Sequence, residues 1–248
     1  MYFLLCHLSL AEVVFTTNIV PNMLNTVLCD GGFIALEGCV TQYYMFSSST
    51  TAECLLLSMM SYDRFMAICY PLHYSALMTQ KLCILLVCSS WLTGAIMSLP
   101  AAILISMLEF CLPNIIDHFF CDLSPILKMA CSDTTFLELE DLILSFPILV
   151  FPFIFIAVTY IQIIFTICRI PSSSGKQKAF STCSSHLLVV CIYYGTLIIV
   201  YMTPLADNII SKILALSYTV LTPLLNPVIY SLRNKEIRDS IKKLRRLW

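Results

Sequence analysis

Long stretches of hydrophobic residues recur along the chain and are separated by short polar segments. Runs near the length of a membrane span cover roughly 1–24, 39–62, 82–108, 142–168, 185–206 and 210–230. A helix needs about 20 apolar residues to cross the hydrocarbon layer, whereas membrane β-strands are only about 10 residues long and alternate in polarity. The pattern therefore predicts an all-α membrane protein with a bundle of six transmembrane helices.

The composition agrees with this prediction. Of the 248 residues, 59% are hydrophobic and only 12% are charged, about half the charged fraction of a soluble domain. The formal net charge of -1 says little about partners, because the distribution of charge matters more than its sum. No basic segment or cleavage site accompanies the first apolar run, so we expect the first helix to begin almost at residue 1.

Basic residues are concentrated in segments that alternating helices place on one side. Twelve of the 14 Lys and Arg residues lie after the second, fourth or sixth apolar run. The two exceptions are Lys128 and Lys212. The positive-inside rule makes this side cytoplasmic, together with the C-terminus. Segment 232–246 is predicted to be an amphipathic helix on anionic lipid, with an apolar face formed by Ile237, Ile241 and Leu244.

Four cysteines fall on the predicted outer side of the membrane. Cys39 begins the second apolar run, and Cys111, Cys121 and Cys131 lie ten residues apart in the long loop after the third. Thiols in an oxidising compartment form disulfides, so we expect two, and the spacing leaves three pairings open. The alternative is a metal site that includes His118 and Cys121, but no further ligands stand at a metal-site spacing.

Two carboxylic acids, Glu12 and Glu53, fall near the middle of the first and second apolar runs. An acidic side chain inside a membrane usually faces the bundle interior and marks a functional site. At similar depths the two can share a cation or a proton. The alternative, equally open, is two protonated acids that are hydrogen-bonded to polar neighbours. His7 and His186 are expected to be hydrogen-bonded packing residues.

Two further polar features lie near the ends of apolar runs. Asp63 and Arg64 stand side by side at the end of the second run, where each needs a partner, water or a function. In the last run, the proline of segment 226–230 (NPVIY) removes a helix hydrogen bond. Asn226 and nearby water can satisfy the freed carbonyl, so a kink that acts as a hinge is expected there.

Five segments, in the right order, resemble the vertebrate odorant receptors, a family of rhodopsin-like G-protein-coupled receptors. They are LSLAE (8–12), MSYDRFMAICYPLHY (60–74), HFFCDLSPILKMACSDT (118–134), KAFSTCSSHL (178–187) and PLLNPVIYSLRNKE (223–236). The second and fourth segments are highly specific. The six predicted helices would then correspond to helices 2–7 of a seven-helix receptor, with residues 1–248 as one receptor domain that lacks the first helix. Glu12, Phe65 and Ser61 depart from the usual Asp, Tyr and Ala.

The resemblance also implies roles for individual residues. Asp63 and Arg64 would form an ionic lock that opens toward the G protein. The other residues of the activation switch would be Tyr160, Asn226, Pro227 and Tyr230. The disulfides would be Cys39–Cys121 and Cys111–Cys131. Glu12 and Glu53 would line an ion pocket that can hold sodium, and no other cofactor is expected.

The ligand pocket is expected toward the outer side of the bundle. Its candidates on the second run are Phe46, Ser47, Thr50 and Thr51. Those on the fifth run share one helical face at i, i+3, i+4 and i+7, and are Tyr194, Leu197, Ile198 and Tyr201; Thr219 lies two turns before Asn226 on the sixth. This wall is apolar with a few hydroxyls and no fixed charge, which suits a small volatile molecule.

The sequence thus predicts an odorant receptor of the plasma membrane and, by resemblance, of olfactory cilia. Odorant binding would shift a helix equilibrium and activate a heterotrimeric G protein of the olfactory stimulatory type. Membrane lipid is expected around the bundle, and no nucleic acid. The main alternative is a truncated, non-signalling product. A transporter or channel is suggested by the two buried acids but lacks internal repeats, and no catalytic arrangement indicates an enzyme.

Overall fold

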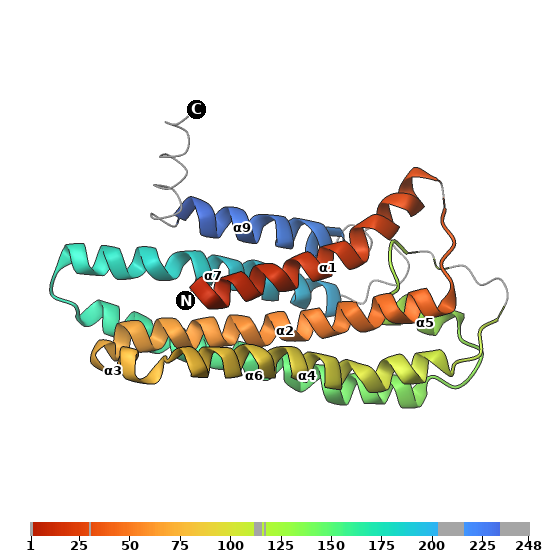
Figure 1. Cartoon of the computed structure of the whole chain (residues 1–248), viewed down its shortest axis with the longest axis horizontal. Coiled ribbons are helices and arrows are strands. Elements are labelled where there is room, and N and C mark those ends of the chain that lie inside the picture. Colours follow the sequence, from red (N-terminus) through yellow and green to blue (C-terminus); the bar gives the residue numbers. More distant parts are fainter. Residues whose placement is uncertain (1, 30, 112–115, 117, 203–215, 234–248) are drawn as a thin grey trace. The chain divides into compact units, whose positions relative to one another are not determined.

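The computed structural model describes residues 2–29, 31–111, 116, 118–202 and 216–233 (Figure 1). Its five long helices are α1 (Tyr2–Leu28), α2 (Leu36–Cys69), α4 (Gln80–Ser106), α6 (Thr135–Arg169) and α7 (Ser173–Met202). Its short helical elements are α3 (Pro71–Leu77), α5 (Leu123–Met129), the π-helix η1 (Ser217–Leu221) and α9 (Thr222–Arg233). The described part of the chain also holds an isolated antiparallel β-bridge between Phe110 and Ala130.

The first five predicted apolar runs each coincide with one long helix, which confirms an all-α protein. The sixth run begins outside the described residues and ends in η1 and α9. The predicted amphipathic helix 232–246 lies outside the described residues from position 234 onward. In the described part of the last run, the π-helix η1 interrupts the regular α-helical hydrogen bonding. The helix α9 follows it and includes Pro227.

Four described helices are long and apolar enough to cross a membrane. They comprise Phe3–Leu28 in α1, Gln80–Ser106 in α4, Thr135–Arg169 in α6 and Ser173–Ile198 in α7. The helix α2 is not among them, although its 34 residues exceed the length required. Its middle is rich in serine and threonine and includes Glu53, which makes it more polar than the other long helices. The number of six spans therefore stays a prediction.

The chain divides into two compact units. The first comprises Met1–Met59 and Thr79–Phe155, and the second comprises Met60–Met78 and Ile156–Trp248. The helices α2 and α6 contribute residues to both. The candidate ligand residues on α2 and both buried acids thus belong to the first unit, whereas Asp63, Arg64 and the candidates on α7 and η1 belong to the second.

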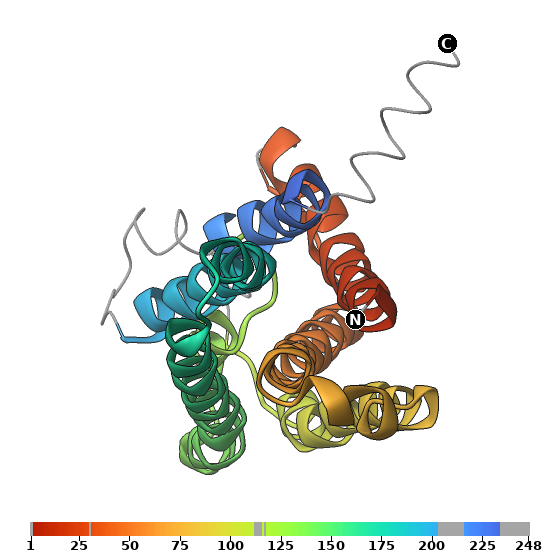
Figure 2. The same cartoon turned by 90° about the vertical axis from the view of Figure 1, so that its left-hand side faces the viewer.

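Small residues allow α4 to lie against α2 in the first unit, as Figures 1 and 2 both show. Gly94 faces the backbone of Ser48 so closely that an added Cβ would run into the Ser48 carbonyl oxygen. One turn along, the Ser98 hydroxyl donates to the hydroxyl of Ser47 at 2.9 Å. This close approach fixes α4 against the part of α2 that carries the candidate ligand residues.

A second core of the first unit lies around the Cys39–Cys121 disulfide. It joins α2, α4, α5, α6 and the loop before α5, and its buried members are Cys39, Tyr43, Ala101, Ala102, Ile105, Cys121, Ile126 and Leu137. Asp122 is the N-cap of α5, because its side chain accepts a hydrogen bond from the Leu123 amide at 2.8 Å. The loop is therefore packed against the helix ends.

In the second unit, α7 packs with both η1 and α9. The inward side of α7 carries Cys183, His186, Val189, Val190, Tyr194 and Leu197, all buried. The short helix α3 starts at Pro71, whose missing amide hydrogen suits the first position of a helix. It folds the chain after α2 back toward the residues at the end of that helix.

Candidate functional site

Two disulfides hold the loop between α4 and α6. The structure joins Cys39 to Cys121 and Cys111 to Cys131, with Cα–Cα distances of 5.4 and 5.6 Å. These are the two pairings that the resemblance implies. Cys121 is thus occupied in a disulfide, and among the described residues no group of three His, Cys, Asp or Glu side chains can hold a metal ion. The alternative of a metal site at His118 and Cys121 is wrong for this structure, since the thiolate is consumed.

The candidate ligand residues on α2 (Phe46, Ser47, Thr50 and Thr51), here called the α2 wall, combine an aromatic ring with hydroxyls and are buried or partly buried. The Phe46 ring packs between Phe15 of α1 and Phe120 of the loop, with ring centroids 5.5 and 5.4 Å away. Ser47 accepts the hydrogen bond from α4 described above, and Thr50 donates to the Phe46 carbonyl at 2.9 Å. Thr51 is also buried. An aromatic ring and several hydroxyls therefore stand together, with Glu53 following.

The candidates on α7 and η1 differ in exposure. Tyr194 and Leu197 are buried, and the Tyr194 ring lies edge-on to that of Tyr193 at a centroid distance of 5.5 Å. Ile198 is 43% exposed, although the periodicity places it on the same face. The buried Thr219 hydroxyl reaches the Leu216 carbonyl at 3.5 Å. Tyr201 belongs to α7, but its side chain lies outside the described set.

The two predicted intramembrane acids are both buried in the first unit. Glu12 is 4% and Glu53 is 5% exposed, and the two carboxyl groups carry the same charge when ionised. The Oε1 atom of Glu53 has no hydrogen-bond partner among the residues that the structure describes. A buried carboxyl oxygen without a donor carries a large desolvation cost. The pair thus offers an acceptor oxygen to a proton or a cation.

Asp63 is held by Tyr74, a residue that the sequence pattern does not single out. The Asp63 side chain is 1% exposed, and its Oδ1 atom accepts a hydrogen bond from the Tyr74 hydroxyl at 2.9 Å. Because Tyr74 lies on α3, this bond ties the folded-back helix to the end of α2. Arg64 beside it is also largely buried, at 9% exposure.

A second polar contact in this unit connects α6 with α7. The Tyr160 hydroxyl lies 2.7 Å from Nδ1 of His186, which confirms that His186 is a hydrogen-bonded packing residue. The hydroxyls of Ser61 and Thr159, 2.6 Å apart, likewise connect α2 with α6. His7 differs, because its buried Nδ1 atom has no hydrogen-bond partner within the described chain.

The remaining predicted switch residues lie on α9. Asn226 is buried. Pro227 and Tyr230 fall within the helix, but their side chains are outside the described set. Their roles in a switch stay predictions.

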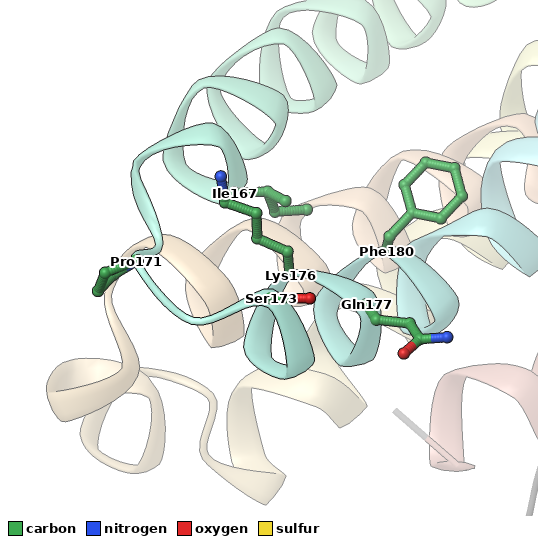
Figure 3. A pocket seen from close by; sticks show the side chains of 6 residues that line it. All are labelled: Ile167, Pro171, Ser173, Lys176, Gln177 and Phe180. Carbon is green, nitrogen blue, oxygen red and sulfur yellow. The ribbon is translucent and has the colours of Figure 1, made fainter.

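A surface cavity of about 480 Å³ lies at the turn between α6 and α7 (Figure 3). Its lining residues are Ile167, Pro171, Ser173, Lys176, Gln177 and Phe180. None of the nine candidate ligand residues belongs to it, and Tyr194 and Leu197 lie several turns further along α7. Because its walls are mostly exposed side chains of a turn, we do not assign it to the ligand site.

Three residues of the site could not be found from the sequence pattern. Tyr74 meets Asp63 only because α3 folds back, and Phe120 meets Phe46 only because the disulfide carries the loop onto α2. Gln42 of α2, 5% exposed, accepts a hydrogen bond from the Cys121 amide at 2.9 Å. Among these three residues, only Gln42 gave a signal in the sequence, as an amide side chain in a largely apolar stretch.

The sequence is also similar to known proteins. A family model described as olfactory receptor matches residues 1–246. The chain is 47% identical over 245 residues to human olfactory receptor 10A7, covering 98% of this chain and 78% of that protein. It is 46% identical over 245 residues to human olfactory receptor 6B2, with the same coverage of 98% and 78%. Human olfactory receptor 11H6 is 45% identical over 246 residues, which are 98% of this chain and 74% of that protein.

Proposed function

Because the chain belongs to the olfactory receptor family, we propose that the α2 wall contacts the odorant. The family consists of odorant-binding receptors that couple to G proteins, not of enzymes, and it does not favour a transporter or channel. The observation that carries the proposal is the buried Phe46 ring, which is followed along α2 by the hydroxyl residues Ser47, Thr50 and Thr51. Small-molecule sites combine apolar walls with a few well-placed polar groups.

The candidates on α7 and η1 form a second proposed set. Tyr194 and Leu197 are buried on one face of α7, and Thr219 is buried on η1. Each set is tested by its own substitutions. Phe46→Ala and Thr50→Val in the first set, and Leu197→Ala in the second, are each expected to raise the odorant concentration needed for half-maximal cAMP. At matched surface levels, wild-type potency in Phe46→Ala and Thr50→Val would contradict the α2 wall, and wild-type potency in Leu197→Ala would contradict the second set.

We propose six membrane crossings, with α2 and the segment that includes α9 added to the four strongly apolar helices. The basic residues after α2, after α6 and beyond α9 support a cytoplasmic location for Asp63, Arg64 and the C-terminus. Lipid is expected to contact the exposed apolar face of α4, which carries Leu85, Leu92, Ile96, Leu99 and Ile103. An epitope tag at the C-terminus should be stained only after permeabilisation of the plasma membrane.

We further propose that the partner is a stimulatory G protein of the olfactory type, engaged in the plasma membrane of olfactory cilia. Arg64 is the proposed contact, released as its surroundings rearrange; Asp63, Tyr160 and Asn226 belong to the same switch. The burial of Arg64 and the hydrogen bond from Tyr74 to Asp63 support an Arg64 side chain that is held in place before activation. Odorant-evoked cAMP in cells that express this G protein tests the coupling, and Arg64→Ala should abolish it.

Glu12 and Glu53 are proposed to hold a sodium ion. The Oε1 atom of Glu53, which has no hydrogen-bond partner among the described residues, supports this, since a cation offsets the burial of a carboxylate. Exchange of sodium for a large organic cation should change the basal cAMP level, and Glu53→Gln should remove that dependence. An unchanged sodium response in Glu53→Gln would instead favour two protonated acids.

A further inference from the structure

We propose that Gln42 is a positioning residue that holds Phe120 over Phe46, and that Phe120 thereby limits the size of odorant that the α2 wall accepts. The inference rests on the proposed function, because it takes Phe46 as part of that wall. It adds two residues to the site, one from α2 and one from the loop between α4 and α6.

The amide of Gln42 bonds in two directions. Its Nε2 atom donates to the Asn18 carbonyl on α1 at 2.9 Å, and its Oε1 atom accepts from the Cys121 amide at 2.9 Å. Both partners are backbone groups, and a carbonyl only accepts while an amide N–H only donates. The orientation of the Gln42 amide is therefore determined by its partners.

Asn18 returns the bond to Gln42. Its Nδ2 atom donates to the Gln42 carbonyl at 2.9 Å, so two reciprocal hydrogen bonds join α1 and α2 at this level. A side chain tied to both helices has little freedom to follow a loop that moves. The loop must instead adapt to Gln42, which makes Gln42 the fixed partner of the Cys121 amide.

The Cys121 backbone connects this fixed point to Phe120. The disulfide to Cys39 holds the Cys121 side chain, but it leaves the direction of the preceding peptide open. The hydrogen bond from the Cys121 amide fixes that direction, because this nitrogen belongs to the peptide that links Phe120 and Cys121. Both residues are almost fully buried, with Cys121 1% and Phe120 2% exposed.

The Phe120 ring then completes a row of three aromatic rings. It lies 5.4 Å from the Phe46 ring at an interplanar angle of 53°, and Phe46 lies 5.5 Å from Phe15. A ligand seated on Phe46 meets the Phe120 ring or displaces it. In close-packed surroundings even one methylene of volume is felt, so the position of Phe120 sets a size limit.

The test uses the full chain with an extracellular tag and a cAMP reporter in cells. The probes are linear primary alcohols and aldehydes of increasing length, with branched and aromatic members of each class. Four variants are compared at matched surface levels. Phe120→Leu makes room directly; Gln42→Met removes both amide bonds but keeps the length; the double variant combines them; and Gln162→Met repeats the glutamine substitution at an exposed site on α6.

Phe120→Leu is expected to shift relative potency toward the larger probes by about tenfold, the size of a small steric discrimination. Gln42→Met should reorder the probes in the same direction, and the double variant should add little to Phe120→Leu, because both act through one ring. Gln162→Met should match the unmodified chain. A merely structural role of Gln42 would lower the surface level of the variant but, at matched surface levels, would leave the order of the probes unchanged.

The outcomes separate this inference from the proposed function. If Phe120→Leu reorders the probes while Gln42→Met does not, the positioning role is overturned. If neither reorders them while Phe46→Ala changes potency, the inference fails and the α2 wall stands. If Phe46→Ala and Thr50→Val both keep the potency of the unmodified chain, the proposed α2 wall fails and the inference falls with it.

Discussion

The hydroxyl oxygen of Tyr160 lies 2.7 Å from Nδ1 of His186, and the two rings are stacked with centroids 5.7 Å apart. Tyr160 stands on α6 and His186 on α7, and both side chains are buried. The contact is therefore a polar bond in an apolar surrounding between two long helices. Its loss leaves an imidazole nitrogen without this partner.

Tyr160→Phe is expected to destabilise the folded receptor by about 1–3 kcal/mol, the cost of a buried polar atom that loses its partner. The measurement is the thermal unfolding midpoint of the purified protein in detergent. Tyr44→Phe, which removes the same hydroxyl at a partly exposed position of α2, serves as the matched control. Equal midpoints for the two variants would show that the Tyr160–His186 bond contributes nothing.

Tyr74→Phe is expected to lower the maximal odorant-evoked cAMP several-fold and to leave the half-maximal odorant concentration unchanged. The Tyr74 hydroxyl anchors α3 to Asp63, so its loss disturbs the surroundings of Asp63 and not the α2 wall. Tyr70→Phe makes the same substitution at a half-exposed neighbour and should behave as the unmodified chain. A shift in potency without loss of amplitude would contradict this assignment.

Gly94→Ala is expected to destabilise the first unit by about 1–3 kcal/mol, as overpacking does in a close-packed interior. The added methyl would collide with the Ser48 carbonyl oxygen, a backbone atom that cannot rotate away. Gly195→Ala is the control, since nothing lies within 4 Å of its added Cβ, and alanine there should be neutral or stabilising by about 0.5–1 kcal/mol. Similar unfolding midpoints for both variants would argue against tight α2–α4 packing.

Asp122→Asn is expected to raise the thermal midpoint at pH 7.5 but not near pH 4. Burial raises the pKa of the Asp122 carboxyl to about 6, from an ordinary value of 3.8. Between those two values the folded state binds the proton more tightly than the unfolded chain. The free energy of unfolding therefore falls as pH rises through this window. Asparagine removes the titration and still caps the helix.

Asp133→Asn is the control for Asp122→Asn, because the pKa of Asp133 is shifted in the opposite direction. Hydrogen bonds from the Thr135 side chain and amide lower the pKa of exposed Asp133. A lowered pKa gives stability that is present above the unfolded value and lost in acid, so Asp133→Asn should not raise the midpoint at pH 7.5. A gain in midpoint that is the same at every pH in Asp122→Asn would exclude burial of the charge as its cause.

The positions of the helices were predictable, because an apolar run long enough to cross a membrane forms a helix in almost every case. The contacts between the helices were not predictable. Glu12 and Glu53 stand out in any apolar stretch, and both are buried as expected of such residues. The periodicity of α7 correctly places Tyr194 and Leu197 on a buried face, but it also includes Ile198, which is 43% exposed. The helical periodicity indicates which side of α7 is buried, but not how wide the buried face is.

Contacts between distant segments were beyond the reach of the sequence pattern. The pairing of Cys39 with Cys121 was one of three combinations until the resemblance selected it. Gln42 and Tyr74 act through partners that are 79 and 11 residues away. A side chain bonded to a backbone amide in another segment leaves no periodic trace, since the partner residue can be of any type.

The brevity of the link between α6 and α7 has a mechanical consequence. The helix α6 ends at Arg169 and α7 begins at Ser173, and the four Cα–Cα steps between these two residues span at most roughly 14 Å. The start of α7 cannot travel further than such a tether allows unless a turn unwinds or the end of α6 travels with it. A displacement of the start of α7 is therefore coupled to a displacement of the end of α6.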